Sequence, residues 1–153
     1  MEIKTIQAVN AYTELKTLKL STIDDETMFK IWGIIRKLRP FHEEYLKDRE
    51  DAKTSISDSD FEHMQDRLRT AKIREELVKK GEHTLTEDDI KDVREINEYF
   101  NAFSAKMDKC LKELDETKID VQIDKIPSES FLKVLKANDK SFELMEQFEW
   151  LLY

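Results

Sequence analysis

The sequence is poor in the residues that interrupt helices or cross-link chains. Its 153 residues include only two glycines, two prolines and one cysteine. Because Gly and Pro build most tight turns, their scarcity predicts few loops and long helices. One cysteine excludes an internal disulfide, so nothing in the chain requires an oxidising compartment. Gly33 and Gly81 stand far apart, which excludes a glycine-rich phosphate-binding loop.

Long apolar segments are also missing. No stretch approaches the roughly 18 consecutive apolar residues that indicate a membrane-spanning helix. The first residues lack the apolar core of a secretion signal. We therefore expect a soluble protein that is made in the cytoplasm and does not engage a membrane.

Positive charge is in the minority. Lys and Arg number 26 against 34 Asp and Glu, and the net charge is -8. Residues 1–81 hold 16 acidic and 16 basic residues, so the whole excess of acid lies in residues 82–153. This imbalance argues against non-specific nucleic-acid binding, which needs cations to replace the phosphate counterions. Two readings of the acidic half stay open: a solvated face that keeps the protein soluble, and a mimic of a polyanion.

What the chain has instead is a strong helical pattern in its second half. Apolar residues recur at alternating steps of three and four, which places them along one narrow seam of a long helix. Such a helix cannot bury its seam alone, so it needs a partner helix in this chain or in another molecule. The seam consists of Val93, Ile96, Phe100, Phe103, Met107, Cys110 and Leu114.

Similar patterns predict three long helices, over about residues 24–54, 60–80 and 87–116. Pro40 lies inside the first of them, but the apolar stripe resumes at Phe41, so we expect a kink and not a stop. Short connections between long helices favour antiparallel packing.

Local signals mark several helix ends. Ser59 with Glu62, and Thr86 with Asp89, have the spacing of capping boxes at helix starts. Gly81 can supply the left-handed residue that ends the helix before it.

The two ends of the chain alternate between apolar and polar residues, as strands do. Residues 1–4 and the run Ile119–Ile123 are each too short to be stable alone, so we expect them to pair. Segments 1–20 and 119–153 would then pack together. The prediction is a single, mainly α domain over residues 1–153: an antiparallel, coiled-coil-like hairpin or bundle with a minor two-stranded β element.

Catalytic and metal-binding patterns are weak. Asp60 and His63 have a spacing that can place two ligands on one helical face, but the chain does not repeat it as di-iron bundles do. His42 and His83 have no partner of that kind, and the single cysteine has no evident base. We therefore predict no catalytic residue, no metal, no cofactor and no enzymatic activity.

Aromatic and other large apolar residues are the better clue to function. They exceed what one thin hairpin needs for its own core, and an exposed apolar patch usually marks an interface. Whether the aromatic end of the chain is core or interface stays open. We predict an interaction surface that includes Phe100, Phe103, Met107, Phe148, Trp150 and Tyr153.

Both ends of the chain resemble small, mostly helical proteins encoded in bacteriophage and prophage genomes. The similar segments are IQAVNAYTELKTLKL, MFKIWGIIRKLRPFHEEYLKDREDA and VQIDKIPSESFLKVLKANDKSFELMEQFEWLL, roughly half of the chain. The resemblance carries no site residues. It implies a phage origin and a role among small accessory proteins.

Two functions follow from these expectations. The first is a non-enzymatic helical interaction protein that serves as a virion assembly or structural accessory, and that either stays in the host cytoplasm or enters the virion. The alternative is an acidic inhibitor of a host defence system, an anti-CRISPR-like decoy that binds a basic protein surface. The expected partner is a phage structural protein or a host protein. A second copy of the chain is a further candidate, and no nucleic acid is expected.

Overall fold

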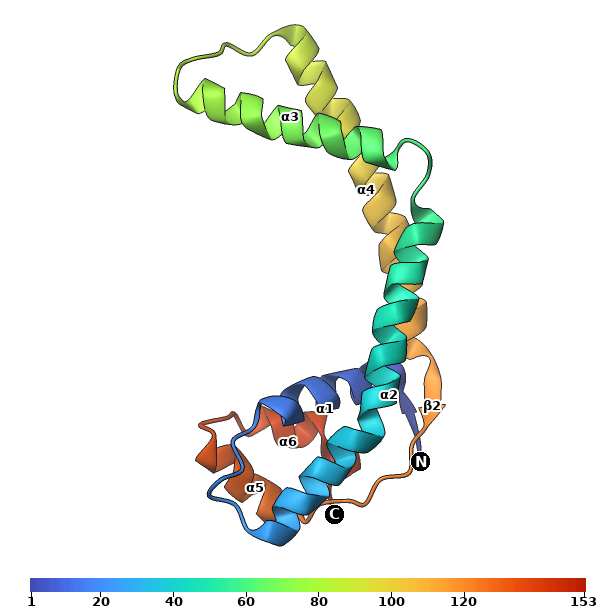
Figure 1. The fold of residues 1–153 in the computed structure, drawn as a ribbon, viewed down its shortest axis with the longest axis vertical. Helices are drawn as coiled ribbons and strands as arrows, with labels where there is room; N and C mark the ends of the chain where they lie inside the picture. Colours follow the sequence, from blue (N-terminus) through green and yellow to red (C-terminus); the bar gives the residue numbers. More distant parts are fainter. The chain divides into compact units, whose positions relative to one another are not determined.

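The computed structural model describes residues 1–153, and helices account for 73% of it (Figure 1). A two-stranded antiparallel sheet is the only sheet. The predicted fold class, mainly α with long helices and a minor β element, is confirmed. The elements in chain order are β1 (Glu2–Lys4), α1 (Thr5–Thr17), α2 (Asp25–Ile56), α3 (Phe61–Lys79), α4 (Glu87–Glu116), β2 (Lys118–Asp120), α5 (Ser128–Ala137), α6 (Glu143–Gln147) and the short 3-10 helix η1 (Glu149–Leu151).

The sheet pairs the first residues of the chain with the segment directly after α4, as the alternating patterns predicted. Ile3 of β1 lies opposite Ile119 of β2 in an antiparallel register. The predicted strand through Ile123 is too long, because β2 ends at Asp120. Beyond the ladder, the Val121 N–H donates to the Met1 carbonyl at 2.9 Å, and the Met1 N donates to the Val121 carbonyl at 2.8 Å.

The helix ends follow local chemistry in some places and not in others. Pro40 does not stop α2, which runs through it. The Thr86–Asp89 capping box at the start of α4 is confirmed: the Thr86 N–H donates to Asp89 Oδ2 at 2.9 Å, and the Asp89 N–H donates to Thr86 Oγ1 at 3.1 Å. Gly81 follows α3 with a φ of 72°, the left-handed conformation that the sequence predicted.

The predicted capping box between Ser59 and Glu62 is wrong. The residue before α3 is Asp60, and its side chain makes no capping hydrogen bond. The Asp60 N–H instead donates to Asp58 Oδ1 at 3.0 Å. In this turn the Asp58 carboxylate therefore accepts a backbone N–H, whereas the sequence predicted that the Ser59 hydroxyl would do so.

Contacts divide the chain into two compact units. The terminal unit comprises residues 1–48 and 112–153, and the hairpin unit comprises residues 49–111. Helices α2 and α4 each contribute residues to both units. Of the 20 buried hydrophobic residues, only Met64 and Ile96 belong to the hairpin unit. The hairpin unit therefore has almost no core of its own.

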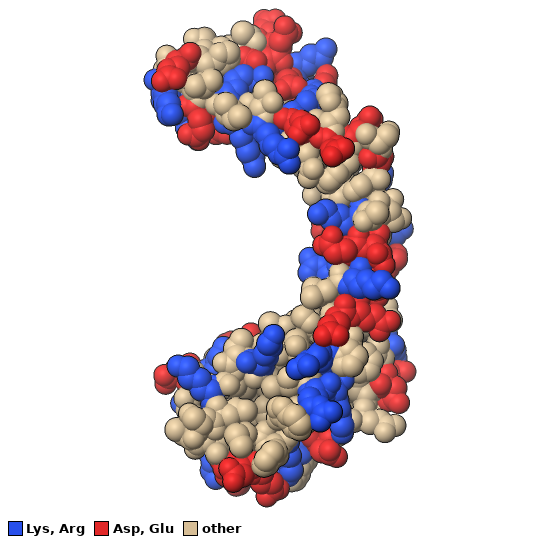
Figure 2. Space-filling model, viewed as in Figure 1, with Lys and Arg blue, Asp and Glu red and all other residues tan.

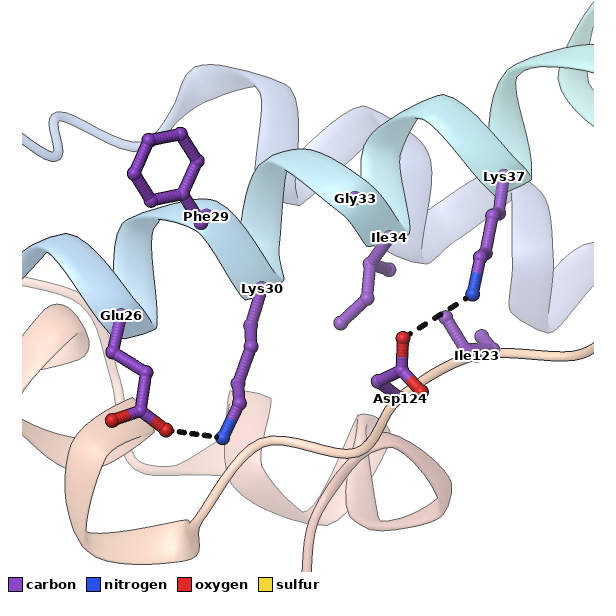
Figure 3. A pocket seen from close by; sticks show the side chains of 8 residues that line it. All are labelled: Glu26, Phe29, Lys30, Gly33, Ile34, Lys37, Ile123 and Asp124. Atoms are coloured by element: carbon purple, nitrogen blue, oxygen red, sulfur yellow. Dashed lines mark hydrogen bonds and ion pairs between the residues drawn. The ribbon is translucent and has the colours of Figure 1, made fainter.

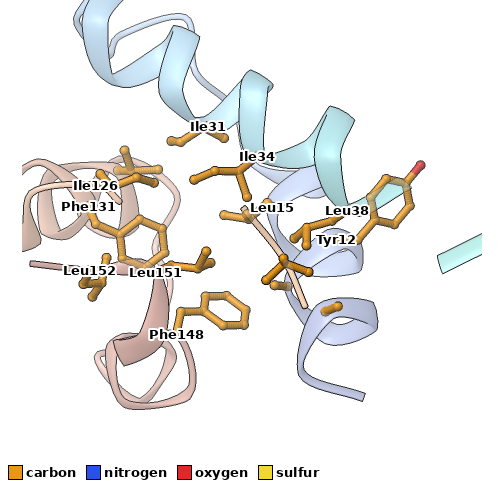
Figure 4. Close-up of a cluster of buried hydrophobic side chains, with 14 of the residues drawn as sticks. Tyr12, Leu15, Ile31, Ile34, Leu38, Ile126, Phe131, Phe148, Leu151 and Leu152 are labelled. Carbon is orange, nitrogen blue, oxygen red and sulfur yellow. The ribbon is translucent and has the colours of Figure 1, made fainter. Parts of the chain in front are cut away.

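The core of the terminal unit forms where α1, the first half of α2, α5 and the C-terminal segment meet (Figures 1 and 4). On α2 the buried side chains Ile31, Ile34 and Leu38 recur at helical spacing and point inward. On the opposite side, the rings of Phe131 and Phe148 pack edge to face with their centroids 6.2 Å apart. Because one face of α2 is fully used by this core, its other face is left to solvent.

Candidate protein-interaction site

An aromatic cluster lies between α3 and α4 in the hairpin unit. The Phe61 ring centroid lies 5.0 Å from that of Phe103 and 6.3 Å from that of Phe100. Phe100, Phe103 and Met107 are all half-buried. The structure therefore brings Phe100 and Phe103, two of the predicted interaction residues, together with α3 and leaves them partly accessible.

Beyond this cluster, a network of ion pairs connects one flank of α3 to α4. Arg67 Nε donates to Asp92 Oδ1 at 2.9 Å, and its Nη2 donates to Glu95 at 2.8 Å. Arg74 bridges Asp89 at 2.9 Å and Asp92 at 3.0 Å. Arg67 and Arg74 are seven residues apart, so they lie on the same face of α3. The network holds this flank of the hairpin closed.

The electrostatics of the network favour its charged form. Asp89 accepts a hydrogen bond from the Thr86 N–H and contacts His83 at 2.9 Å, and these bonds lower the pKa of its carboxyl to about 2. The guanidinium groups of Arg67 and Arg74 lower the pKa of Asp92. Both carboxylates are therefore ionised near neutral pH, and their charge is matched inside the hairpin.

The other flank of the hairpin is open and apolar. A groove of about 350 Å³ lies between α3 and α4, with Arg74 at its boundary with the ion-pair network. We call it the hairpin groove. Its lining is Leu68, Ala71, Lys72, Arg74, Glu75, Val78, Leu85, Val93, Ile96 and Asn97.

The spacing of side chains explains why the groove is hollow. Leu68, Ala71 and Val78 repeat at helical intervals on α3, where they face Val93 and Ile96 of α4 across the groove. Ala71 carries only a methyl group, so it leaves space between the two helices. Ile96 is buried at the bottom of the groove.

The rim of the hairpin groove leaves apolar surface in contact with solvent. Leu85 is 49% exposed and Val93 is 38% exposed. Lys, Arg, Asp and Glu side chains are interspersed over the face of α3 and α4 drawn in Figure 2. The lining of the groove itself includes charges of both signs, Lys72, Arg74 and Glu75, beside its apolar residues, a composition that resembles an apolar patch with a polar rim.

The remaining predicted interaction residues lie in the terminal unit and have different environments. Phe148 is 2% exposed, so its assignment to an interaction surface is wrong: it packs on Phe131 in the core. Trp150 is half-buried, and its Nε1 has no hydrogen-bond partner. Tyr153 is 69% exposed. Only Tyr153 of these three offers a large accessible surface.

The hairpin groove and the predicted interaction residues Phe100, Phe103 and Met107 lie on different parts of α4. The hairpin groove uses its first half, at Val93 and Ile96, and adds Leu85 from the preceding loop. The signal that could have found it is on α3, where the seam thins to Ala71 and is interrupted by Glu75. Because the apolar seam of α3 is thinner than that of α4, part of the α4 seam stays uncovered.

No group of three or more His, Cys, Asp or Glu side chains in the structure could hold a metal ion. No helix combines the length and the hydropathy needed to cross a lipid bilayer. Comparisons with known protein families, with curated proteins and with solved structures found no match for this chain.

Proposed function

We propose that this protein is a non-enzymatic helical interaction protein whose hairpin groove binds an amphipathic helix of a partner protein. The observation that carries the proposal is the asymmetry of the hairpin. Ion pairs close one flank, between Arg67, Arg74 and the carboxylates of α4, whereas the other flank exposes an apolar recess.

A helix is the partner element that suits this recess. Two antiparallel helices cover each other along one face only. A third helix that packs along their uncovered side would complete a three-helix core. The anchors of such a helix would contact Leu85 and Val93, which are partly exposed, and cover Ile96. Burying apolar surface at about 25 cal/mol per Å² would supply the binding energy.

For the biological role, we propose a virion assembly or structural accessory of a bacteriophage. This role fits an apolar binding groove and the resemblance of both chain ends to small phage proteins. The alternative, an acidic decoy that inhibits a host defence system, needs unmatched negative charge. Beside the hairpin groove, Asp89, Asp92 and Glu95 of α4 are paired with Arg67 and Arg74, so a decoy would have to use carboxylates elsewhere in the chain.

Site-directed photo-crosslinking tests the groove in cells that express the protein from its native genome. A photoreactive amino acid at position 93 should capture one partner protein, and the same amino acid at position 73 should not. Ile73 is the matched control because it is 64% exposed on α3 and lies outside the groove. A captured virion protein supports assembly, and a captured host protein supports inhibition.

Binding to the purified partner then measures the contribution of the groove. Leu85→Asp places a charge at the apolar rim and should weaken binding roughly tenfold or more, because the charge would be desolvated on binding. Ile73→Asp should change binding little. Equal capture from both positions, or equal affinity of both variants, would contradict the proposal.

A further inference from the structure

The outward face of α2 in the terminal unit carries aromatic residues and cations where a solvent-facing surface is expected to be mixed and polar. Phe29 is 64% exposed and Trp32 is 53% exposed. Residues 28–42 include four Lys or Arg and no Asp or Glu. We call this surface the α2 face; it comprises Phe29, Trp32, Gly33, Arg36, Lys37 and Arg39.

The arrangement of side chains on the α2 face is open. The Arg36 guanidinium stacks over the Trp32 ring, 4.7 Å from its centroid. At Gly33 the helix has no side chain, and an open recess of about 350 Å³ begins there (Figure 3). In Figure 3 the Phe29 ring points away from the other side chains that line this recess, so it stands out from the helix.

The charges of the α2 face are only partly matched within the chain. Lys37 reaches Asp124 at 3.4 Å, and beside the face Lys30 pairs with Glu26. Arg36 and Arg39 make no ion pair in the structure. Figure 2 shows Lys and Arg side chains gathered over this part of α2. The face therefore suits a partner that offers carboxylates beside an apolar surface.

The same unit carries a surface of the opposite kind. Residues 141–153 include Glu143, Glu146 and Glu149 but no Lys or Arg, and none of these three carboxylates is in an ion pair. Phe142 is 62% exposed. A recess of about 460 Å³ lies there, and we call this surface the C-terminal face. The recess is lined by Ser128, Phe142, Met145, Glu146, Glu149, Leu152 and Tyr153.

The two faces are neighbours in the terminal unit. The extended segment after β2 connects them, because Ile123 and Asp124 line the recess beside α2. Further along the same segment, Ile126 forms a β-bridge with Leu152. Neighbouring faces of opposite charge can exchange reciprocally between two copies around a two-fold axis.

We propose that the α2 face binds the C-terminal face of a second copy of this chain. Phe29 and Trp32 of one copy enter the recess beside Phe142 and Tyr153 of the other. Arg36 and Arg39 meet the carboxylates of Glu146 and Glu149. The contact buries the exposed aromatic side chains of both faces and pairs their unmatched charges. The contact lies outside the hairpin groove and does not depend on the function proposed for it.

A charge-swap series measured by light scattering and analytical ultracentrifugation tests this contact. The wild-type protein should self-associate. Arg36→Glu with Arg39→Glu should weaken association roughly tenfold or more, because two attractions become repulsions. Glu146→Lys with Glu149→Lys should do the same. A chain that carries all four substitutions should associate again, since its charges are once more complementary.

Matched controls separate this contact from general charge effects. Lys47→Glu with Lys53→Glu changes two exposed cations on the second half of α2 and should leave association unchanged. Trp32→Ala and Phe142→Ala should each weaken it without lowering the melting temperature, because both side chains are more than half exposed. Self-association that stops at a dimer and growth into longer chains both support the contact.

Three results would overturn the proposal. The first is a wild-type protein that stays monomeric up to about 1 mM, the weak end of the affinity scale. The second is a four-substitution chain that folds but does not associate. The third is self-association that Leu85→Asp abolishes and the charge swaps leave intact, which would place the contact at the hairpin groove instead.

Discussion

Asp89 is the residue on which the start of α4 depends most. Its carboxylate accepts the Thr86 N–H, contacts His83 and pairs with Arg74, and its side chain is only 13% exposed. One charge thus caps a helix and contributes to the network that closes the hairpin. These bonds favour the ionised form and lower the pKa of Asp89 from 3.8 to about 2.

This shift predicts an acid-sensitive hairpin. Because the folded-state pKa is lower than that of the unfolded chain, the stabilisation is fully present above about pH 4 and is lost as the pH falls toward about 2. Asp89→Asn should lower the melting temperature near neutral pH, and the gap to wild type should narrow below about pH 4. Circular dichroism melts across this range measure both effects. Asp108→Asn, an exposed site on the same helix, is the control. A constant gap at all pH values would contradict the assignment.

The two glycines show how the same residue acts differently in two elements. Gly81 ends α3 with a φ of 72°, which L-residues adopt only at a cost. Gly33 lies inside α2, where an added Cβ would meet nothing within 4 Å. The first glycine is required by the backbone, and the second weakens a helix without a conformational reason.

The substitutions Gly81→Ala and Gly33→Ala should therefore change stability in opposite directions. We expect Gly81→Ala to lower the free energy of unfolding by about 1 kcal/mol or more, because alanine is strained at positive φ. Gly33→Ala should raise it by about 1 kcal/mol through helix propensity. Urea unfolding of both variants measures these changes, and a shift of the same sign in both would refute the argument.

How well each element could be predicted depends on how local its signals are. The start of α4 was predicted correctly because its two capping bonds join Thr86 and Asp89, which are only three residues apart. The start of α3 was not, because the Asp58 carboxylate accepts the Asp60 N–H and the helix begins one residue later than a Ser59 cap requires. Ile3 and Ile119 could be paired only because both segments alternate and neither is stable alone.

The candidate site was harder to predict because it depends on packing between helices. The seam residues of α3 and α4 were visible in the sequence, but the hollow opposite Val93 arises only when Ala71 is brought beside it. Phe148 was grouped with Trp150 and Tyr153 in the aromatic end of the chain, for which core and interface both stayed open. Its burial depends on Phe131, which is distant in sequence, so no local pattern could reveal it.

At the scale of the whole molecule, burial is distributed very unevenly between the two units. The hairpin unit holds Met64 and Ile96 as its only buried hydrophobic residues, whereas the terminal unit holds the other 18. Local openings should therefore cost much less free energy in the hairpin unit than in the terminal unit.

Hydrogen exchange followed by mass spectrometry measures this difference. Backbone amides of α3 and of α4 up to Met107 should exchange faster than those of α1 and of α2 before Tyr45. Binding of a partner helix in the hairpin groove should slow exchange in α3 and leave α1 unchanged. Equal protection of the two units in the isolated protein would show that the hairpin is stable without a partner.

The pairing of β1 with β2 also has a consequence for synthesis on the ribosome. Ile3 cannot find Ile119 until more than one hundred further residues have been made, and the Thr5 N–H waits equally long for the Thr117 carbonyl. Until α5 and the segment after it have been made, only the first half of α2 is available to cover the apolar side of α1. We therefore expect α1 to reach its native packing during synthesis only after residues 126–152 have been made, because Ile126, Phe131 and Leu152 belong to the same core.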